Sequence, residues 1–134
     1  MRDDIWLNNR LEQIWQFLFP EVIKGNKVLI KFKGRWKNKF GHISKKGEHS
    51  EIVINGLFRH DEVPEYMIDL TIAHELIHYM HGFSSPLPKL YKHPHKGGVV
   101  TRELRKRGFS HLLIKEKYFL KDQWLALYTR LVIS

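Results

Sequence analysis

His74, Glu75 and His78 form the pattern H-E-x-x-H, which carries two potential metal ligands and a carboxylate on one short segment. Side chains four residues apart lie on the same face of an α-helix, so both imidazoles can bind one metal ion. Glu75 lies about 100° further round such a helix than His74 and can hold a water molecule beside that metal. An isolated buried histidine is more often a hydrogen-bonded core residue. The pair with Glu75 between its members instead favours a zinc site with Glu75 as the acid/base of a hydrolytic reaction.

Catalytic zinc usually has three protein ligands and one position for water, so a third ligand must lie elsewhere in the chain. A metzincin would continue the pattern to H-E-x-x-H-x-x-G-x-x-H. This chain has His81 in place of that glycine and Ser84 in place of the third histidine, which excludes that class. The candidates further along the chain are His95 and His93, and His81 and Glu103 are the remaining alternatives.

The segment from Glu65 to His81 is predicted to be the helix that carries this pattern, and Gly82 suits its end. Apolar residues cover most of its circumference, which is typical of a helix buried on nearly all sides. His74, His78 and His81 nevertheless share one face of this helix. The sequence therefore predicts a central buried helix with an imidazole-bearing face.

The other elements predict a single α+β domain over residues 1–134, with an N-terminal helix, a small antiparallel sheet, the buried helix and further C-terminal helices. A connector is expected to follow Phe109, and the segment Glu51–Asn55 is a candidate edge strand that pairs with substrate. The predicted elements are a helix at Asp4–Phe19, strands at Lys27–Lys33, Trp36–Ser44 and Ser50–Asn55, a turn at Lys45–Glu48, a loop at Phe83–Pro94, and helices at Gly98–Lys106 and Asp122–Leu131.

The composition limits the kinds of site and compartment. The chain has 134 residues and no cysteine, which excludes disulfides, thiol catalysis and zinc sites with cysteine ligands. Its start, from Met1 to Trp6, has acids where a signal peptide has bases, and no stretch is apolar enough for a membrane span. We therefore expect a soluble protein of the cytoplasm, or of the nucleus in a eukaryote, without a membrane partner.

The net charge of +9 is concentrated between Val22 and Gly47, a stretch without acids. Within it, five cations alternate with other residues, and a period of two on extended backbone would place all five on one face. Such a stripe can be a solvated outer surface, but repulsion among unrelieved cations favours a polyanion partner, most plausibly DNA. A second basic cluster follows on a predicted helix and is interpreted as helix surface. The stripe consists of Lys31, Lys33, Arg35, Lys37 and Lys39, and the cluster of Arg102, Arg105, Lys106 and Arg107.

Three segments resemble the SprT-like metallopeptidases, the family that includes the Spartan proteases of DNA–protein crosslinks. The first is the strand Ile52–Asn55, and the second is Thr71–His78, which is closely similar to the core of the family. The third is His95 followed by a basic, leucine-containing helix that ends at Gly108. In all, the order of elements resembles the family over about 100 residues, from Leu11 to Gly108, and only the H-E-x-x-H segment is specific.

This resemblance implies a zincin-like fold and a zinc endopeptidase that acts on DNA-associated proteins. It implies that His74, His78 and His95 bind zinc and that Glu75 is the catalytic acid/base. The chain departs from the family pattern at Lys96, where glycine is common, and at Val99, where an aromatic residue is common. It also lacks the cysteine-ligated zinc ribbon that many members carry.

Two alternatives remain open at this stage. A regulatory protease that resembles the ImmA/IrrE family would use a downstream glutamate ligand, and Glu103 suits this poorly because its neighbours are basic. A non-catalytic nucleic-acid-binding module would have a structural metal closed by a fourth ligand. Within the enzyme hypothesis, Tyr79 and Tyr91 are candidate donors to the oxyanion of the reaction.

Overall fold

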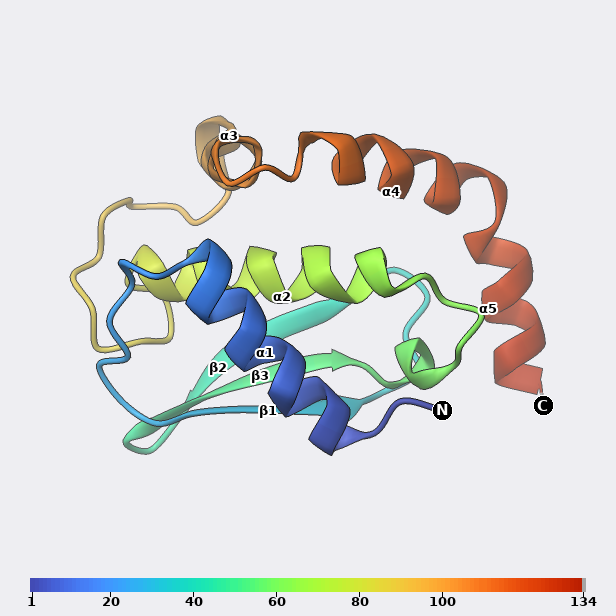
Figure 1. Cartoon of the computed structure of the whole chain (residues 1–134), viewed down its shortest axis with the longest axis horizontal. Coiled ribbons are helices and arrows are strands. Elements are labelled where there is room, and N and C mark those ends of the chain that lie inside the picture. Colours follow the sequence, from blue (N-terminus) through green and yellow to red (C-terminus); the bar gives the residue numbers. More distant parts are fainter. Residues whose placement is uncertain (134) are drawn as a thin grey trace.

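A three-stranded sheet lies beneath a layer of helices, and a second pair of helices lies above that layer (Figure 1). The computed structural model describes residues 1–133 and confirms the expected α+β class. Among these residues, no helix is both long and apolar enough to cross a bilayer. The elements are α1 (Asp4–Leu18), β1 (Val28–Lys33), β2 (Gly41–Lys46), β3 (His49–Asn55), α2 (Glu65–Met80), α3 (Val99–Lys106), α4 (Ser110–Asp122) and α5 (Trp124–Ile133), with 3-10 turns at Gly56–Arg59 and Lys96–Gly98.

The sheet is mixed, with the strand order β1-β3-β2. β2 and β3 form an antiparallel hairpin, whereas β1 pairs with β3 in parallel. The prediction of an antiparallel sheet is therefore wrong for β1. After β1 the chain passes to the far edge of the sheet and forms β2 there, and it then turns back as β3 between the other two strands, parallel to β1. The prediction that Glu51–Asn55 is an edge strand is also wrong, since β3 is central and β1 and β2 form the two edges.

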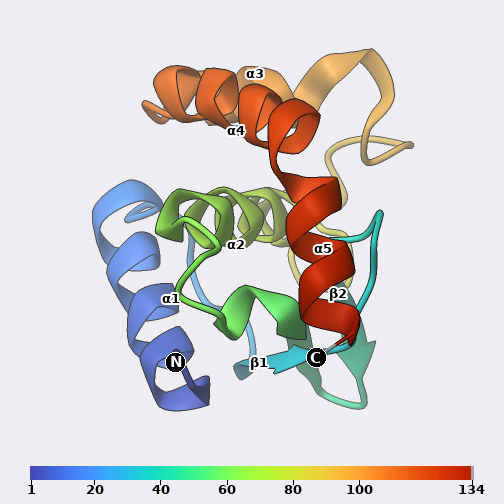
Figure 2. The same ribbon diagram turned by 90° about the vertical axis from the view of Figure 1, so that its right-hand side faces the viewer.

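Helix α2 is central, as its all-round apolar pattern predicts. Figure 2 shows α1 beside it, the sheet below it, and α3 and α4 above it. Its apolar residues are almost completely buried, with Met67, Ile68 and Leu76 at 0% exposure. Burial on every side holds the backbone of α2 rigidly and gives its polar side chains fixed positions.

Helix α1 begins and packs as its sequence predicts. The Asp3 side chain accepts a hydrogen bond from the Trp6 N–H (2.8 Å) and caps the first turn. Leu7, Leu11 and Ile14 recur at helical spacing and face the core. The helix thus covers β1 and one side of α2.

The connection from β1 to β2, residues 34–40, is not a strand, which corrects the prediction of a strand from Trp36. Three of its carbonyl groups accept hydrogen bonds from side chains rather than from the backbone of a neighbouring strand. The buried Asn55 side chain donates to the carbonyls of Trp36 (2.7 Å) and Lys39 (2.9 Å), and the Trp124 indole donates to the carbonyl of Lys37 (2.8 Å). These hydrogen bonds satisfy the carbonyl groups of the segment in a loop conformation, without a partner strand.

The five-cation stripe is therefore not one face of a continuous strand. Only Lys31 and Lys33 lie on β1, and Lys31 pairs with Glu51 (3.5 Å). Arg35 donates to the carbonyl groups of Leu131 (3.1 Å) and Val132 (2.7 Å) at the end of α5. Part of the stripe is thus engaged within the molecule.

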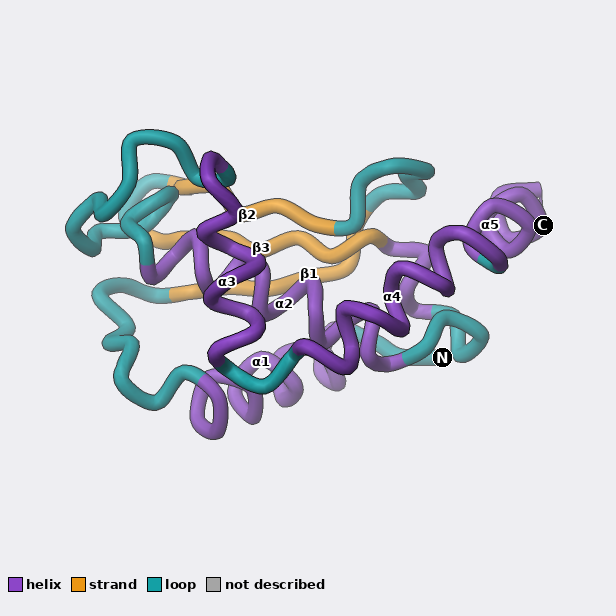
Figure 3. Tube along the Cα trace, turned by 90° about the horizontal axis from the view of Figure 1, so that it is seen from above, coloured by secondary structure: helices purple, strands orange, loops and turns teal. Residues whose placement is uncertain are grey.

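The segment expected to be a connector after Phe109 is the helix α4, and this prediction is wrong. Seen from above, α3 and α4 pass over α2, and α5 leaves at the far end (Figure 3). Leu112, Leu113 and Phe119 face inward at helical spacing and are the signal that could have identified α4. The exposed Ile114 and Tyr118 on the outer side obscure this pattern.

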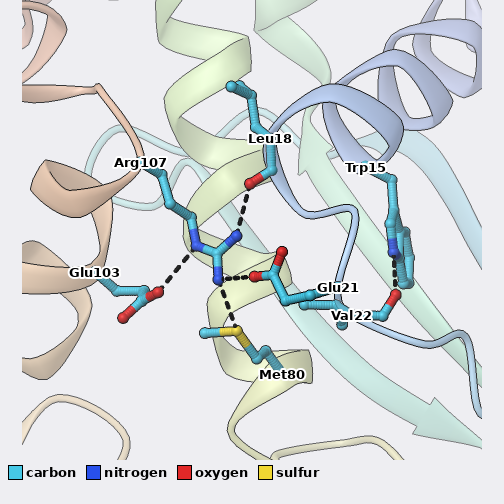
Figure 4. Close-up of polar contacts among 7 residues, drawn as sticks. All are labelled: Trp15, Leu18, Glu21, Val22, Met80, Glu103 and Arg107. Atoms are coloured by element: carbon cyan, nitrogen blue, oxygen red, sulfur yellow. Dashed lines mark hydrogen bonds and ion pairs between the residues drawn. The ribbon is translucent and has the colours of Figure 1, made fainter.

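Arg107 of the second basic cluster is a structural residue (Figure 4). Its guanidinium donates to Glu103 (3.0 Å), to the carbonyl group of Leu18 (2.6 Å), to Glu21 and to the Met80 sulfur (3.2 Å). These groups lie on or next to α3, α1 and α2, so one side chain joins three elements. The side chain is only 13% exposed, which strengthens these charged hydrogen bonds.

We expect Arg107→Ala to lower the free energy of unfolding by about 2–4 kcal/mol, because it leaves partly buried acceptors without a donor. Urea unfolding of the variant and the parent would measure this difference. Arg105→Ala is the matched control, since Arg105 lies on α3 two residues before Arg107 and is exposed. The control should change stability by less than about 0.5 kcal/mol, and equal losses in both variants would contradict the bridging role of Arg107.

Candidate metal centre

Three imidazoles converge at the surface of α2. His74 and His78 come from successive turns of the helix, and His95 comes from the end of the loop that leads to α3. Their Nε2 atoms are 3.0 Å apart between His74 and His78, 2.9 Å between His78 and His95, and 3.3 Å between His74 and His95. The structure thus brings the two histidines of the H-E-x-x-H pattern together with His95, the third ligand that the family resemblance implies.

Hydrogen bonding among the imidazoles does not account for this triangle. Each Nε2 carries either one hydrogen or one lone pair, directed outward in the plane of its ring. One nitrogen therefore cannot satisfy two others at once. A cation within reach of all three satisfies every lone pair, and nitrogens bound about 2.0–2.1 Å from a tetrahedral ion are about 3.3 Å apart. The three histidines can therefore hold a metal ion.

The protonation states of the buried ligands suit metal binding. Burial lowers the pKa of His74 to about 4, with a smaller contribution from His95. Burial also lowers the pKa of His78 to about 3, and the neighbouring histidines add to this effect. Both rings are therefore neutral at pH 7, which is the form that binds a metal.

The His78 ring is oriented by packing. Its Nδ1 is buried and has no hydrogen-bond partner within residues 1–133. The Phe83 ring lies edge-on to it, with centroids 6.2 Å apart. Steric contact, rather than a hydrogen bond from the other ring nitrogen, therefore directs Nε2 of His78 toward the other imidazoles.

Glu75 lies beside the triangle, and its side chain is almost fully buried, with the residue 5% exposed. It forms no hydrogen bond or ion pair with any residue in the described part of the chain. Burial raises the pKa of the Glu75 carboxyl to about 8, and the more distant Lys39 opposes this slightly. A dication at the three nitrogens would lower this pKa again by direct attraction. The carboxyl group can thus exchange a proton near neutral pH.

The position of His95 depends on two consecutive glycines that follow it. Gly97 and Gly98 have φ angles of +73° and +68°, in the left-handed region that disfavours other residues. These two left-handed residues turn the backbone between His95 and the start of α3. The third imidazole is therefore placed by local backbone conformation in an exposed segment.

We expect Gly97→Ala to weaken metal binding about 5–30-fold. An alanine in the left-handed region costs about 1–2 kcal/mol, and metal binding must restore that conformation in an exposed loop that can otherwise relax. Gly47→Ala is the matched control, because Gly47 also has a positive φ angle (+63°) and nothing lies within 4 Å of a Cβ at either position. Competition with a fluorescent zinc chelator would measure both affinities. Equal weakening by the control would exclude a specific role for Gly97.

The other candidate ligands lie outside the triangle. His93 is exposed in the loop, and Glu103 pairs with Arg107 (3.0 Å). His81 ends α2, where its ring packs against Tyr91 with centroids 4.7 Å apart. Its predicted place on the same helical face does not bring it to the other imidazoles. Within residues 1–133, the cluster contains three potential ligands and no fourth.

The two tyrosines considered as oxyanion donors have other contacts. The Tyr79 hydroxyl donates to the Asn26 side chain (2.7 Å) and accepts from the Gly25 N–H (3.0 Å). Tyr79 is therefore a buried structural residue that holds the loop before β1. Tyr91 packs against His81, as described above.

Two cavities open on either side of His74 and Glu75. One is about 310 Å³ and lies between α2, α3 and α4, and we call it the Glu116 pocket. The other is about 350 Å³ and extends along β2 past His78 to His95. The Glu116 pocket is lined by Phe40, Gly41, Leu70, Thr71, His74, Glu75, Thr101, Leu104, Leu113 and Glu116.

Gly41 and Glu116 are site residues that the sequence pattern does not reveal. Gly41 brings β2 against α2, since a Cβ there would lie 2.6 Å from the Thr71 methyl group. Glu116 lies on α4, and the apolar spacing of that helix could have shown that Glu116 is helical. No sequence signal places either residue in the same pocket as Glu75, because only tertiary packing brings β2 and α4 to α2.

Comparisons with known proteins assign no family to this chain. No family model, no curated protein and no solved structure matches it. The function is therefore argued from the geometry of the site.

Proposed function

We propose that this protein is a zinc-dependent endopeptidase that hydrolyses peptide bonds of DNA-associated proteins. The observation that carries this proposal is the convergence of three imidazole Nε2 atoms within 2.9–3.3 Å beside a buried carboxyl group that has no partner within residues 1–133. Three imidazole nitrogens, with no fourth ligand among residues 1–133, favour zinc with an open position. The similarity of Thr71–His78 to SprT-like metallopeptidases supports the same function.

The residues divide the chemistry between them. His74, His78 and His95 would hold the zinc, which would polarise the scissile carbonyl group and make water at the site more acidic. Glu75 accepts a hydrogen bond from the attacking water and takes its proton on a carboxylate oxygen. The same oxygen then delivers the proton to the leaving amide nitrogen, so that the carboxylate is regenerated.

The edge strand β2 is suited to hold an extended substrate. The Asn55 N–H donates to the Phe40 carbonyl (2.8 Å), and hydrogen bonds alternate along an antiparallel pair, so Gly41 and Ile43 direct their backbone groups away from β3. The Ser84 hydroxyl already donates to the Ile43 carbonyl (3.3 Å). The outward groups of Gly41, which lines both cavities, are placed to pair with a peptide that crosses Glu75.

The two alternatives have less support. A protease of the ImmA/IrrE type needs a carboxylate as third ligand, and Glu103 is paired with Arg107. A structural metal would be enclosed by a fourth protein ligand. The cluster instead has an open side next to Glu75 and two cavities.

The proposal is tested by metal content and cleavage. The purified protein should contain about one zinc per chain and should cleave an unfolded protein such as reduced casein. The chelator 1,10-phenanthroline should abolish cleavage, added zinc should restore it, and the non-chelating isomer 1,7-phenanthroline should have no effect. Protein that excludes zinc, or cleavage that persists after the metal is removed, would contradict the proposal.

The DNA part of the proposal is supported by the surplus of nine positive charges and by the absence of acids between Val22 and Gly47. Lys33 and Lys37 are the exposed cations of the stripe whose side chains form no hydrogen bond, ion pair or cation–π contact with described residues, whereas the Lys39 ammonium lies over the Trp36 ring, 4.7 Å from its centroid. They are therefore the members best placed to contact phosphate groups.

We expect the double substitution of Lys33 and Lys37 by glutamine to reduce the dependence of DNA affinity on salt. Each lost phosphate contact should lower the slope of log K against log salt by about 0.9. Fluorescence anisotropy with a labelled oligonucleotide at several salt concentrations would measure this slope. Substitution of Lys117 and Lys121, exposed on α4, makes the same change in net charge and is the control. Equal effects of both pairs would show that only net charge matters.

A further inference from the structure

Glu116 is a partly buried carboxylate on α4 that lines the Glu116 pocket. It forms no hydrogen bond or ion pair with any residue from 1 to 133. Burial raises the pKa of its carboxyl group, which reflects the loss of water without a compensating partner. The nearby Lys115 does not compensate it, since its ammonium lies over the Tyr66 ring, 5.1 Å from the centroid.

This lack of a partner is unusual for the acids of this chain. Among described residues, the other partly buried acids are paired with arginine or lysine. Asp69 pairs with Arg10 (2.6 Å), Glu51 with Lys31 (3.5 Å), and Glu103 with Arg107 (3.0 Å). Glu75 and Glu116 are the two exceptions, and both line the same cavity. In a protein with nine surplus positive charges, the two buried or partly buried acids that have no cationic partner among residues 1–133 thus share one cavity.

The remaining walls of the pocket suit the stem of a long basic side chain. Leu70, Leu104 and Leu113 provide apolar surface between Glu75 and Glu116. Lysine and arginine place their methylene groups along such surface and keep the charged end at a polar partner. Helix α4 runs above α2 (Figure 1), and its residue Glu116 lines the pocket together with residues of α2.

We propose that the Glu116 pocket binds a lysine or arginine side chain of the peptide substrate, next to the bond that is cleaved. This inference rests on the proposed peptidase function and adds a specificity to it. The Glu116 carboxylate accepts hydrogen bonds from the cationic end of that side chain. Proteins that bind DNA neutralise phosphates with lysine and arginine, so their chains are rich in the residues that this pocket would select.

The long-range field of the molecule cannot produce this preference. A net charge of +9 repels basic peptides at a distance, and screening limits that effect to about 8–10 Å in physiological salt. A preference for a cation at one substrate position must therefore arise from a nearby carboxylate.

The test measures peptide binding separately from cleavage. It uses zinc-loaded Glu75→Gln protein and fluorescent peptides that are acetylated at the N-terminus and amidated at the C-terminus. One position at a time carries arginine or citrulline, which has nearly the same shape without the charge. At one position, arginine should bind at least about tenfold more tightly than citrulline. Adding Glu116→Gln should abolish this difference, and adding Glu116→Lys should reverse it in favour of a glutamate peptide.

Asp122→Asn is the matched control, because Asp122 is an exposed acid on α4 outside the pocket. The arginine preference should be unchanged in this control. Equal binding of arginine and citrulline at every position, or no peptide binding, overturns the inference. A preference that appears only with a free N-terminus would assign the pocket to an α-amino group and also overturns it. If the preference is present but the unsubstituted protein does not cleave the peptides, the peptidase proposal fails and the binding specificity stands.

Discussion

Glu75→Gln should leave zinc bound and lower kcat/KM for peptide cleavage by about 10²–10⁴-fold. The amide has nearly the same shape as the carboxylate and can still hold a water molecule, but it cannot accept and return the proton. Because Glu75 is buried and lies outside the triangle of imidazoles, its replacement removes a proton acceptor without removing a ligand. Metal analysis and steady-state kinetics on the same preparation would measure both consequences.

The control for this prediction is Glu48→Gln, which makes the same chemical change at an exposed position in the turn between β2 and β3. It should leave both zinc content and kcat/KM unchanged. Loss of zinc from the Glu75→Gln protein would mean that Glu75 supports the metal. Full activity with zinc bound would show that another group moves the proton, and the assigned role of Glu75 would then be wrong.

His95→Ala should weaken zinc binding by more than the roughly 10–100-fold that follows loss of a supporting hydrogen-bond partner. Removal of this ring leaves two ligands from α2 and opens one side of the site to water. Within residues 1–133, no other histidine, cysteine, aspartate or glutamate offers a ligand atom to this cluster, so the lost ligand has no ready replacement. Chelator competition gives the affinity, and activity should fall with zinc occupancy.

His93→Ala provides the comparison that identifies the third ligand. His93 is two residues away in the same loop and is exposed, so this variant alters the loop to a similar extent without removing a nitrogen from the triangle. It should bind zinc as the parent does. If His93→Ala loses zinc and His95→Ala retains it, the loop has a different register when the metal is bound.

The central helix and its two histidines were predictable because local rules determine them. Helical spacing places His74 and His78 on one face, and the all-round apolar pattern indicates that α2 is buried. The residues alone gave His95 only as one of several candidates for the third metal ligand. Its position depends on the left-handed Gly97 and Gly98, and no rule of spacing across a loop specifies where such a turn directs the chain.

The errors arose where tertiary contacts override a local pattern. Residues 36–40 alternate like a strand, but Asn55 and Trp124 bind their carbonyl groups. The parallel pairing of β1 with β3 cannot be read from alternation, because period two shows which face is buried and not which strand is the neighbour. The unpaired state of Glu116 was likewise invisible, since it depends on which cations fold close to it.

Both ends of α5 form hydrogen bonds with the segment that precedes β2. Trp124, at its start, donates to the Lys37 carbonyl (2.8 Å), and the carbonyl groups of Leu131 and Val132, near its end, accept from Arg35. The Trp124 ring also packs edge-on against Phe40, with centroids 5.7 Å apart, and Phe40 forms part of the Glu116 pocket. Amide hydrogen exchange in residues 36–40 should therefore accelerate when α5 detaches. Local opening near the end of the described chain would in this way reshape the wall of a cavity beside Glu75.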